Sequence, residues 1–314
     1  MKLTYTFLIA LLACATALGQ SSELKLNLEK NKVYRLQANS EQTINQTING
    51  NQQTVESKTS NTVSLKVVDA TSAFLVAEVH FDTLSSKTNS MGITSNMSSA
   101  LEGDMKSQKP ADIMSTVMNR LSNSPVYAKI DFTGKVLEII NLKMIADMSL
   151  KDTAEMSLTG PAAATLKSQI VNMVNENSII TMIEMFTRYL PGKAVAPGDK
   201  WTTVDVMHSG GMSLQVSSSS QLEKVSGNVA TVTAESEIKA AENAPPMEMG
   251  AAKITYDDIN GSGKSNLTID LQTGLVTEST AKSHIFGNLG VNVQGMSMQI
   301  PMDITSDSTI KRLQ

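Results

Sequence analysis

The chain has 314 residues, with 26 Lys and Arg against 30 Asp and Glu, and 41% of its residues are hydrophobic. This length suits one large or two small domains with a buried core. The slight acidic excess leaves no basic surface, which excludes nucleic acid as a partner. A single cysteine excludes internal disulfides and thiolate zinc sites.

Residues 1–19 have the features of a secretory signal peptide. Lys2 precedes a largely apolar run over 3–13, and Ala17–Leu18–Gly19 supplies the small residues that signal peptidase requires. The run is shorter than the roughly 20 apolar residues of a membrane span. We therefore expect a secreted or periplasmic protein that begins near Gln20 and has no transmembrane span in its mature chain.

Cys14 leaves a second interpretation of this segment open. Leu11–Leu12–Ala13–Cys14 resembles a bacterial lipobox, whose cysteine is acylated and becomes the first residue. The residues that follow, 15–18, stay largely apolar, and this favours ordinary cleavage and a cysteine-free mature chain. Acylation would instead make the protein an outer-membrane lipoprotein.

Residues 24–84 alternate between apolar and polar positions, which predicts antiparallel strands with one face in water. Asn49–Gly50–Asn51 is typical of a tight hairpin between the polar runs 41–48 and 52–60. The opening strand is predicted from alternate leucines, Leu24, Leu26 and Leu28.

The centre of the chain predicts helices. Residues 110–121 carry apolar side chains at helical spacing, and a hairpin follows around Phe132–Thr133–Gly134. Pro161 suits the first turn of a second helix. Ile179, Ile180, Ile183 and Phe186 form the apolar stripe of a third helix, which Leu190–Pro191–Gly192 ends.

Alternating strands return from Trp201 to the C-terminus, with a loop over 241–250. The predicted fold class is therefore α+β, with one or two strongly curved antiparallel sheets and the central helices packed across them. Two similar Asp…Thr-Gly turns, 131–136 and 270–276, leave a pseudo-repeat of two halves open. The expected division is 20–190 and 191–314, or one continuous domain over 20–314.

Two motifs of enzyme chemistry fail on inspection. Gly261–Ser262–Gly263–Lys264–Ser265 resembles the end of a phosphate-binding loop, but Asp258 stands where the first glycine is required. Strand-like alternation follows it, so we predict a hairpin turn. Ser213 and Ser297 each follow Gly-Met, but glutamine replaces the second glycine of a nucleophile elbow. Both are expected to be structural serines of strands.

No metal site, cofactor or catalytic residue is predicted. The histidines lack metal-ligand spacing; they are His80, His208 and His284. Met296 and Met298 could offer thioethers to Cu(I), but their alternation with Ile300 equally predicts a core face. The chain has 19 methionines, which serve either as core filler or as the lining of a pliable apolar pocket.

The segment 190–201 stops a helix, turns at Pro197–Gly198–Asp199 and starts a strand at Trp201. It resembles the Pro…Val-x-x-Gly-Asp-x-Trp junction of uncharacterised exported proteins of the Bacteroidota, as do Leu24–Lys25–Leu26 and Lys32–Val33–Tyr34. This resemblance implies a fold and a compartment but no activity. A weaker likeness in layout is to half-barrel envelope carriers of lipids and lipoproteins, where a curved sheet and crossing helices enclose an acyl chain.

These observations predict an exported, non-enzymatic binding protein that holds a lipid or another apolar ligand between sheet and helices. The alternative is a cell-surface interaction module without a ligand cavity, whose partner would be an envelope protein. Trp201 favours a core anchor over a sugar-binding residue. The residues expected to line the ligand site are Met173, Ile180, Ile183, Phe186 and Trp201.

Overall fold

Antiparallel strands form most of the molecule. The computed structural model describes residues 21–314 except 49, 210, 250–251, 257 and 294, so the predicted signal peptide and Cys14 lie outside the described residues. The strands are β1 Ser22–Glu23, β2 Val33–Ile48, β3 Asn51–Ala70, β4 Phe74–Ser90, β5 Ile93–Ser98, β6 Val126–Asp131, β7 Val136–Ile139, β8 Ala194–Val195, β9 Lys200–Ser209, β10 Met212–Ser226, β11 Val229–Ala240, β12 Met247–Met249, β13 Ala252–Thr255, β14 Asn260–Asp270, β15 Val276–Val293 and β16 Met296–Leu313.

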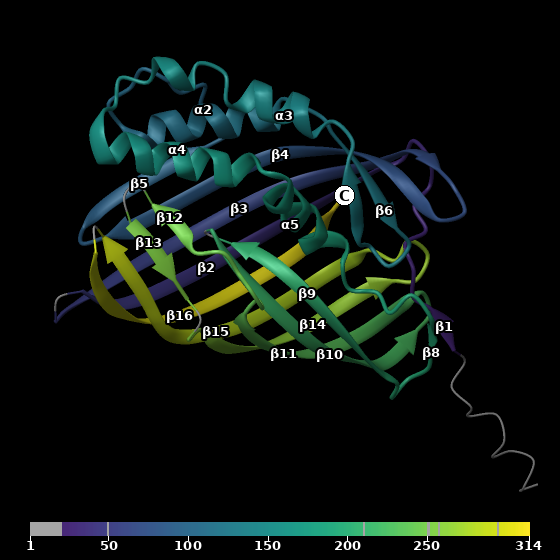
Figure 1. The fold of residues 1–314 in the computed structure, drawn as a ribbon. Helices are drawn as coiled ribbons and strands as arrows, with labels where there is room; N and C mark the ends of the chain where they lie inside the picture. Colours follow the sequence, from purple (N-terminus) through teal and green to yellow (C-terminus); the bar gives the residue numbers. More distant parts are fainter. Residues whose placement is uncertain (1–20, 49, 210, 250–251, 257, 294) are drawn as a thin grey trace, which may run out of the picture.

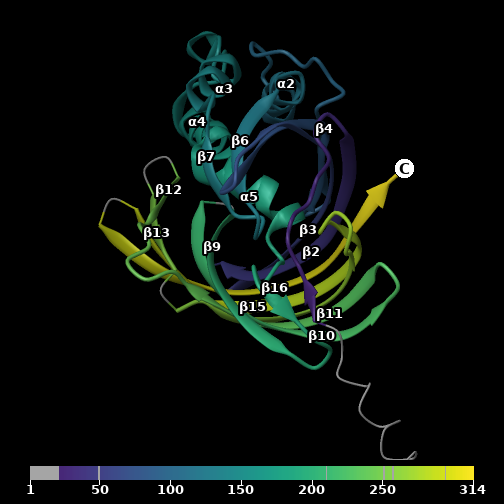
Figure 2. The ribbon, with the colours of Figure 1, turned by 90° about the vertical axis from the view of Figure 1, so that its right-hand side faces the viewer.

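One 14-stranded sheet contains nearly all of these strands (Figure 1). Its continuous path is β7-β6-β4-β3-β2-β16-β15-β14-β11-β10-β9, while β1 and β8 pair separately. The C-terminal β16 pairs antiparallel with β2, from Met302↔Gln46 to Leu313↔Arg35, so both halves of the chain share the sheet. The sheet curves around α5, and the predicted α+β class with a strongly curved antiparallel sheet is confirmed (Figure 2).

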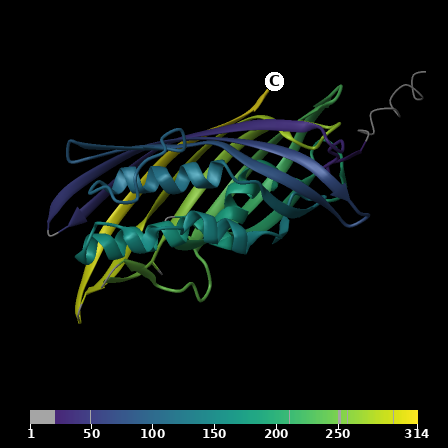
Figure 3. The ribbon, with the colours of Figure 1, turned by 90° about the horizontal axis from the view of Figure 1, so that it is seen from above.

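The helices of the described residues are α2 Pro110–Ser122, α3 Leu142–Ser149, α4 Gly160–Val174 and α5 Glu176–Thr187. Three of them were predicted, whereas the short α3 was not. Pro161 lies in the first turn of α4, where its missing N–H costs nothing. The Asn175 side chain caps α5 by accepting from the Ser178 N–H at 2.8 Å. Helices α2 and α4 lie side by side, and α5 lies against the sheet (Figure 3).

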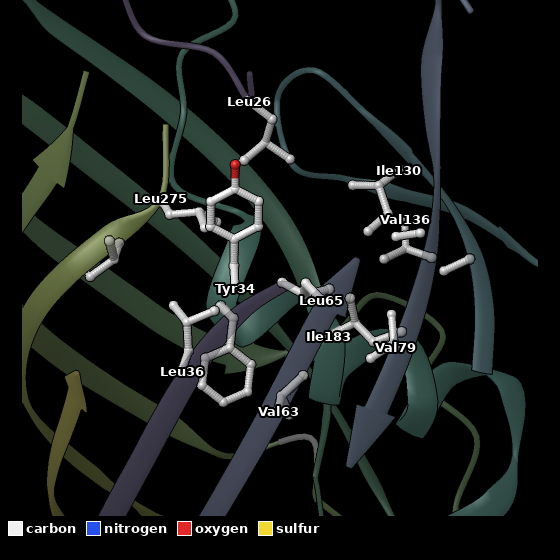
Figure 4. Packing of buried hydrophobic residues seen from close by; sticks show 14 of the residues in the cluster. Leu26, Tyr34, Leu36, Val63, Leu65, Val79, Ile130, Val136, Ile183 and Leu275 are labelled. Atoms are coloured by element: carbon white, nitrogen blue, oxygen red, sulfur yellow. The ribbon is translucent and has the colours of Figure 1, made fainter. Parts of the chain in front are cut away.

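The main core fills the space between α5 and one end of the sheet (Figure 4). Side chains from β2, β3, β4 and β6 converge there with Ile183 of α5 and Leu26 of the N-terminal segment. A second cluster joins α2 to α4 through Ile113, Val117 and Ile170. We call the sheet face toward α5 the inner face and the opposite one the outer face.

The expected opening strand is wrong, although its alternation is real. Leu24 and Leu26 are each 1% exposed, but residues 24–28 form an extended segment outside any β-ladder. The Leu26 N–H donates to the Phe132 carbonyl and the Asn27 N–H to the Thr273 carbonyl, both at 2.9 Å. The segment therefore ties together the two Thr-Gly turns, and its leucines alternate because one side rests on the core.

Two further expectations are corrected in the C-terminal half. Gly261–Ser265 lies within β14 and is not a hairpin turn. A Cβ on Gly261 would lie 2.6 Å from the His284 carbonyl oxygen, so this glycine permits a close approach of two strands. Met296 and Met298 do not form a core face: they are 69% and 41% exposed, because the β15–β16 hairpin extends past the packed part of the sheet.

Candidate ligand-binding site

A cavity of about 370 Å³ lies between α5 and the inner face of the sheet. Strands β2, β3, β9, β10, β11, β14, β15 and β16 form its floor. On its other side lie Thr181, Glu184 and Met185 of α5, followed by Arg188 and Tyr189. This volume falls within the range of about 300–1,000 Å³ that is typical of small-molecule sites.

The floor consists largely of small side chains in one register. Seven consecutive strands each place a Ser, Ala or Thr at the same level, and all seven line the cavity. We call this set the small-residue row. In sheet order it is Ser220, Ala234, Ser265, Ala281, Ser308, Ser40 and Thr59. None of these side chains reaches far from the sheet, so the space below α5 stays open.

Large apolar residues flank the small-residue row on both sides. Leu222, Val232 and Leu267 occupy the neighbouring inner positions toward the main core. In the other direction large side chains return after one more inner position, among them Ile238 and Ile304 of a separate cluster. The cavity is therefore a gap between two packed regions of the same face, and its ends are apolar.

Several hydroxyls on the floor bond to one another. The Ser218 and Ser236 Oγ atoms are 2.7 Å apart, and the Ser308 hydroxyl donates to Ser40 Oγ at 3.0 Å. Three further hydroxyls, those of Ser220, Ser265 and Ser279, have no hydrogen-bond partner among the described residues. Ser220 and Ser279 are only 8% and 6% exposed. Neither hydroxyl is among the fully enclosed polar atoms without a partner, which in the described residues are Ser149 Oγ and Trp201 Nε1, so both are accessible to water or to a ligand in the cavity.

Charged side chains gather at one edge of the cavity. Arg188 Nη2 lies 3.2 Å from Asp205 Oδ1 of β9, and Nη1 donates to Thr133 Oγ1 at 3.2 Å. Glu184 Oε1 accepts from the Val136 N–H of β7 at 2.8 Å. Burial, aided by the Asp205 charge, raises the pKa of Glu184 against the opposing effect of that hydrogen bond and of Arg188. The cluster joins α5 to both terminal strands of the sheet.

Tyr189 and Met185 supply the less polar part of the α5 side. The Tyr189 hydroxyl donates to the Met185 carbonyl oxygen. Burial raises the pKa of Tyr189 well above its ordinary value, so the phenol stays neutral. Its ring remains partly accessible because it borders the cavity.

The predicted lining residues lie elsewhere, Met173 on α4, Trp201 on β9 and the other three on α5. Ile183, Phe186 and Trp201 are buried in the main core, at 0%, 1% and 6% exposure. Met173 and Ile180 are partly buried against it. None of these five is among the described residues that line the cavity, which contacts the polar side of α5. The repeated small residues at alternate positions of the C-terminal strands are the signal that could have pointed to the floor.

The histidines do not converge. His80 pairs with Glu78 and His284 with Asp303, at Nε2–O distances of 3.0 and 2.7 Å. His208 Nδ1 lies 3.0 Å from Ser213 Oγ on the neighbouring strand, and burial lowers the pKa of this histidine. Within the described part of the chain, no three His, Cys, Asp or Glu side chains are grouped as a metal site would require.

A family model places the chain among known sequences. It matches residues 72–276, more than half of the chain, and its description is "Family of unknown function (DUF6263)". The chain therefore belongs to this family of unknown function. No curated protein matches it.

Solved structures resemble the chain only distantly. An outer membrane channel from Pseudomonas putida F1 is 9% identical with a TM-score of 0.26, over 92% of this chain and 97% of that one. OccK11 (OpdR) of Pseudomonas aeruginosa is 6% identical with a TM-score of 0.22, over 91% and 99%. Salmonella typhi OmpF, in complex with daunomycin, is 9% identical with a TM-score of 0.22, over 92% and 100%. Such low TM-scores say nothing of function. Among the described residues, the helices are too short or too polar to cross a membrane.

Proposed function

We propose that this protein is an exported, non-enzymatic binding protein that holds a lipid or another small amphipathic molecule in the cavity beneath α5. The observation that carries the proposal is the small-residue row, which opens about 370 Å³ between α5 and the sheet. The cavity is partly open to solvent, so water can enter it. A molecule that displaces this water would bury the apolar part of the lining, which favours binding.

Export is part of the same proposal. The features of residues 1–19 favour a secreted or periplasmic protein, and acylation at Cys14 would make it an outer-membrane lipoprotein. The junction that ends at Trp201 supports kinship with exported proteins of the Bacteroidota. In that compartment the protein would carry or sense its ligand, alone or with an envelope protein as partner.

The experiment is to purify the chain from its native host without detergent and to measure its intact mass under native conditions, followed by solvent extraction. We expect an adduct that extraction releases as a small amphipathic molecule. Ala281→Leu fills the floor of the cavity and should abolish the adduct, because the new side chain occupies the ligand volume. Ser219→Leu, on the exposed outer face of β10 next to Ser220, is the matched control and should retain it.

A chain that gives a clean apo mass, and whose extracts contain no ligand, would contradict the proposal. The same holds if Ala281→Leu and Ser219→Leu retain an identical adduct, since the molecule would then bind outside the cavity. Either result would favour the interaction module, whose partner should then be captured by crosslinking in intact cells.

A further inference from the structure

From the charges and hydroxyls of the cavity, we infer that the ligand is an uncharged amphiphile whose polar end carries hydroxyl groups, and not the anion of a fatty acid. This inference rests on the proposed function. It adds the chemical class of the ligand, which follows from the ion pairs and hydrogen bonds that the polar groups of the cavity form within the protein.

The cavity offers an anion no free positive charge. Three of the described lining residues are charged: Glu184, Arg188 and Asp205. Arg188 is the single cation among them, and Asp205 and Thr133 occupy its guanidinium through Nη2, Nε and Nη1 at 3.2–3.3 Å. With both carboxyl groups ionised the lining therefore carries a net charge of one negative unit.

A carboxylate ligand would meet Glu184 and Asp205 inside the protein, where charge repulsion is screened less than in water. The lysines of the surrounding strands give no compensation. Lys58, Lys264 and Lys282 lie on the outer face, each within 2.9 Å of a carboxylate partner there. Burial already raises the pKa of Glu184, so a second buried negative charge at this edge is disfavoured.

Hydroxyl groups of a ligand, in contrast, can form hydrogen bonds with serines in the floor of the cavity. Ser220 of β10 and Ser279 of β15 are buried, line the cavity and lack a hydrogen-bond partner among the described residues; Ser265 of β14 lies between them. A serine hydroxyl donates one hydrogen bond and accepts two. Ser265 and Ser279 lie on neighbouring strands, whereas Ser220 lies two strands beyond Ser265, about 10 Å across the sheet. A ligand with vicinal hydroxyls can therefore reach Ser265 and Ser279 together, while its apolar part contacts Met185, Leu267 and Ile310.

The volume sets the size of suitable probes. A cavity of 370 Å³ corresponds to roughly a dozen water-sized volumes of about 30 Å³ each. Decane-1,2-diol and decanoate match this size and each other, because both have ten carbons and two oxygens. They differ in charge and in hydroxyl groups, which are the two properties that the inference concerns.

The first test is calorimetric titration of delipidated protein with each probe at about pH 8, where decanoate is ionised. We expect decane-1,2-diol to bind at least about tenfold more tightly than decanoate. The double variant Ser265→Ala with Ser279→Ala should lose about tenfold in affinity for the diol and little for decanoate. Equal or tighter binding of decanoate by the wild-type protein would overturn the inference.

The second test removes the carboxylate partner of Arg188. Asp205→Asn removes the carboxylate that holds Arg188, so decanoate should bind about tenfold more tightly than to wild type, and the preference for the diol should shrink. Asp307→Asn breaks an equivalent pair with Lys282 on the outer face and should change neither affinity. If Asp205→Asn does not fold, Glu184→Gln tests the same repulsion, because it removes one negative charge and keeps an oxygen for the Val136 N–H. Unchanged decanoate binding in the folded variant contradicts the inference.

The ligand class and the proposed function are contradicted by different results. If decanoate binds tightly and Ala281→Leu abolishes this binding, the cavity is a ligand site but the assigned ligand class is wrong. If neither probe binds and no native ligand is extracted, the proposed function fails, and the ligand class fails with it.

Discussion

The two faces of the sheet differ most at the level of the small-residue row. Over the seven strands of the row the inner face carries only Ser, Ala and Thr, whereas six of these residues, all but Ser220, have a charged neighbour in sequence on the outer face. Three cross-strand ion pairs stand there: Glu235–Lys264 at 2.8 Å, Lys282–Asp307 at 2.9 Å and Lys58–Glu41 at 2.6 Å. The same strands thus present an open floor on one side and a line of charge pairs on the other.

The register of the strands decides which residues lie at the level of the cavity. Small side chains pack almost equally well in several strand registers, so the small-residue row does not by itself specify its register. A shift of one residue would turn the charged side chains of the outer face inward. The three ion pairs favour this alignment, whereas the like charges that face each other directly, Lys264↔Lys282 and Asp307↔Glu41, oppose it. The flanking apolar rows supply the burial energy. The apolar rows on either side therefore specify the register that leaves the space above the small-residue row open.

The largest effect should come from the apolar part of the inner face. Ile269 of β14 is 0% exposed in the main core, and Ile269→Ala should lower the free energy of unfolding by about 2–5 kcal/mol. Asn266→Ala, exposed on the outer face of the same strand, should change it by less than about 0.5 kcal/mol. Urea unfolding measures both. Similar losses would mean that the two faces do not differ as described.

A smaller effect should separate packed from open positions within the inner face. Ala230→Leu inserts a large side chain where Ala230 is 0% exposed, and should cost about 1–3 kcal/mol of unfolding free energy. Ala281→Leu makes the same change in the small-residue row and should cost less than about 1 kcal/mol, because the cavity accepts the added atoms. Thermal and urea unfolding of the two variants check this. Equal destabilisation would show that the row is packed.

The smallest effect is expected in the pH dependence of stability, which should differ between Glu184 at the cavity and Glu235 on the outer face. Burial raises the pKa of Glu184, so its contribution to stability is present below the unfolded pKa of about 4.3 and is lost as the pH rises through the folded value. The hydrogen bond from Lys264, with the charge of that lysine, lowers the pKa of Glu235. Its contribution is present above the unfolded pKa and is lost as the pH falls through the folded value.

Relative to wild type, Glu184→Gln should therefore gain stability as the pH rises from about 4 to 8, while Glu235→Gln should lose stability. Melting temperatures measured across this range would show the two trends. Differences of the same sign for both variants would contradict the assignment of Glu184 to a buried setting and Glu235 to a solvated ion pair.

Much of the fold was predictable because its signals are local. Alternation indicated most strands, and the apolar stripe Ile179, Ile183 and Phe186 indicated α5, which runs Glu176–Thr187. The cavity was not predictable in the same way. The stripe of α5 packs into the core, and the residues that line the cavity come from the side that the sequence marks only as polar, Thr181, Glu184 and Arg188. An apolar sequence pattern identifies the side chains that pack in the core, and it does not identify the space that the packed elements leave between them.

By itself, the sequence determined most strands, three of the four described helices and the α+β class, because side-chain alternation and turn chemistry act over a few neighbouring residues. Only the tertiary structure decided that Ser308 pairs with Ser40, 268 positions away in the chain, and that Ala281 lies between Ser265 and Ser308. Such alignment depends on the pairing of distant strands, which no short segment encodes. The small-residue row, and with it the cavity beneath α5, exists only once those strands have paired.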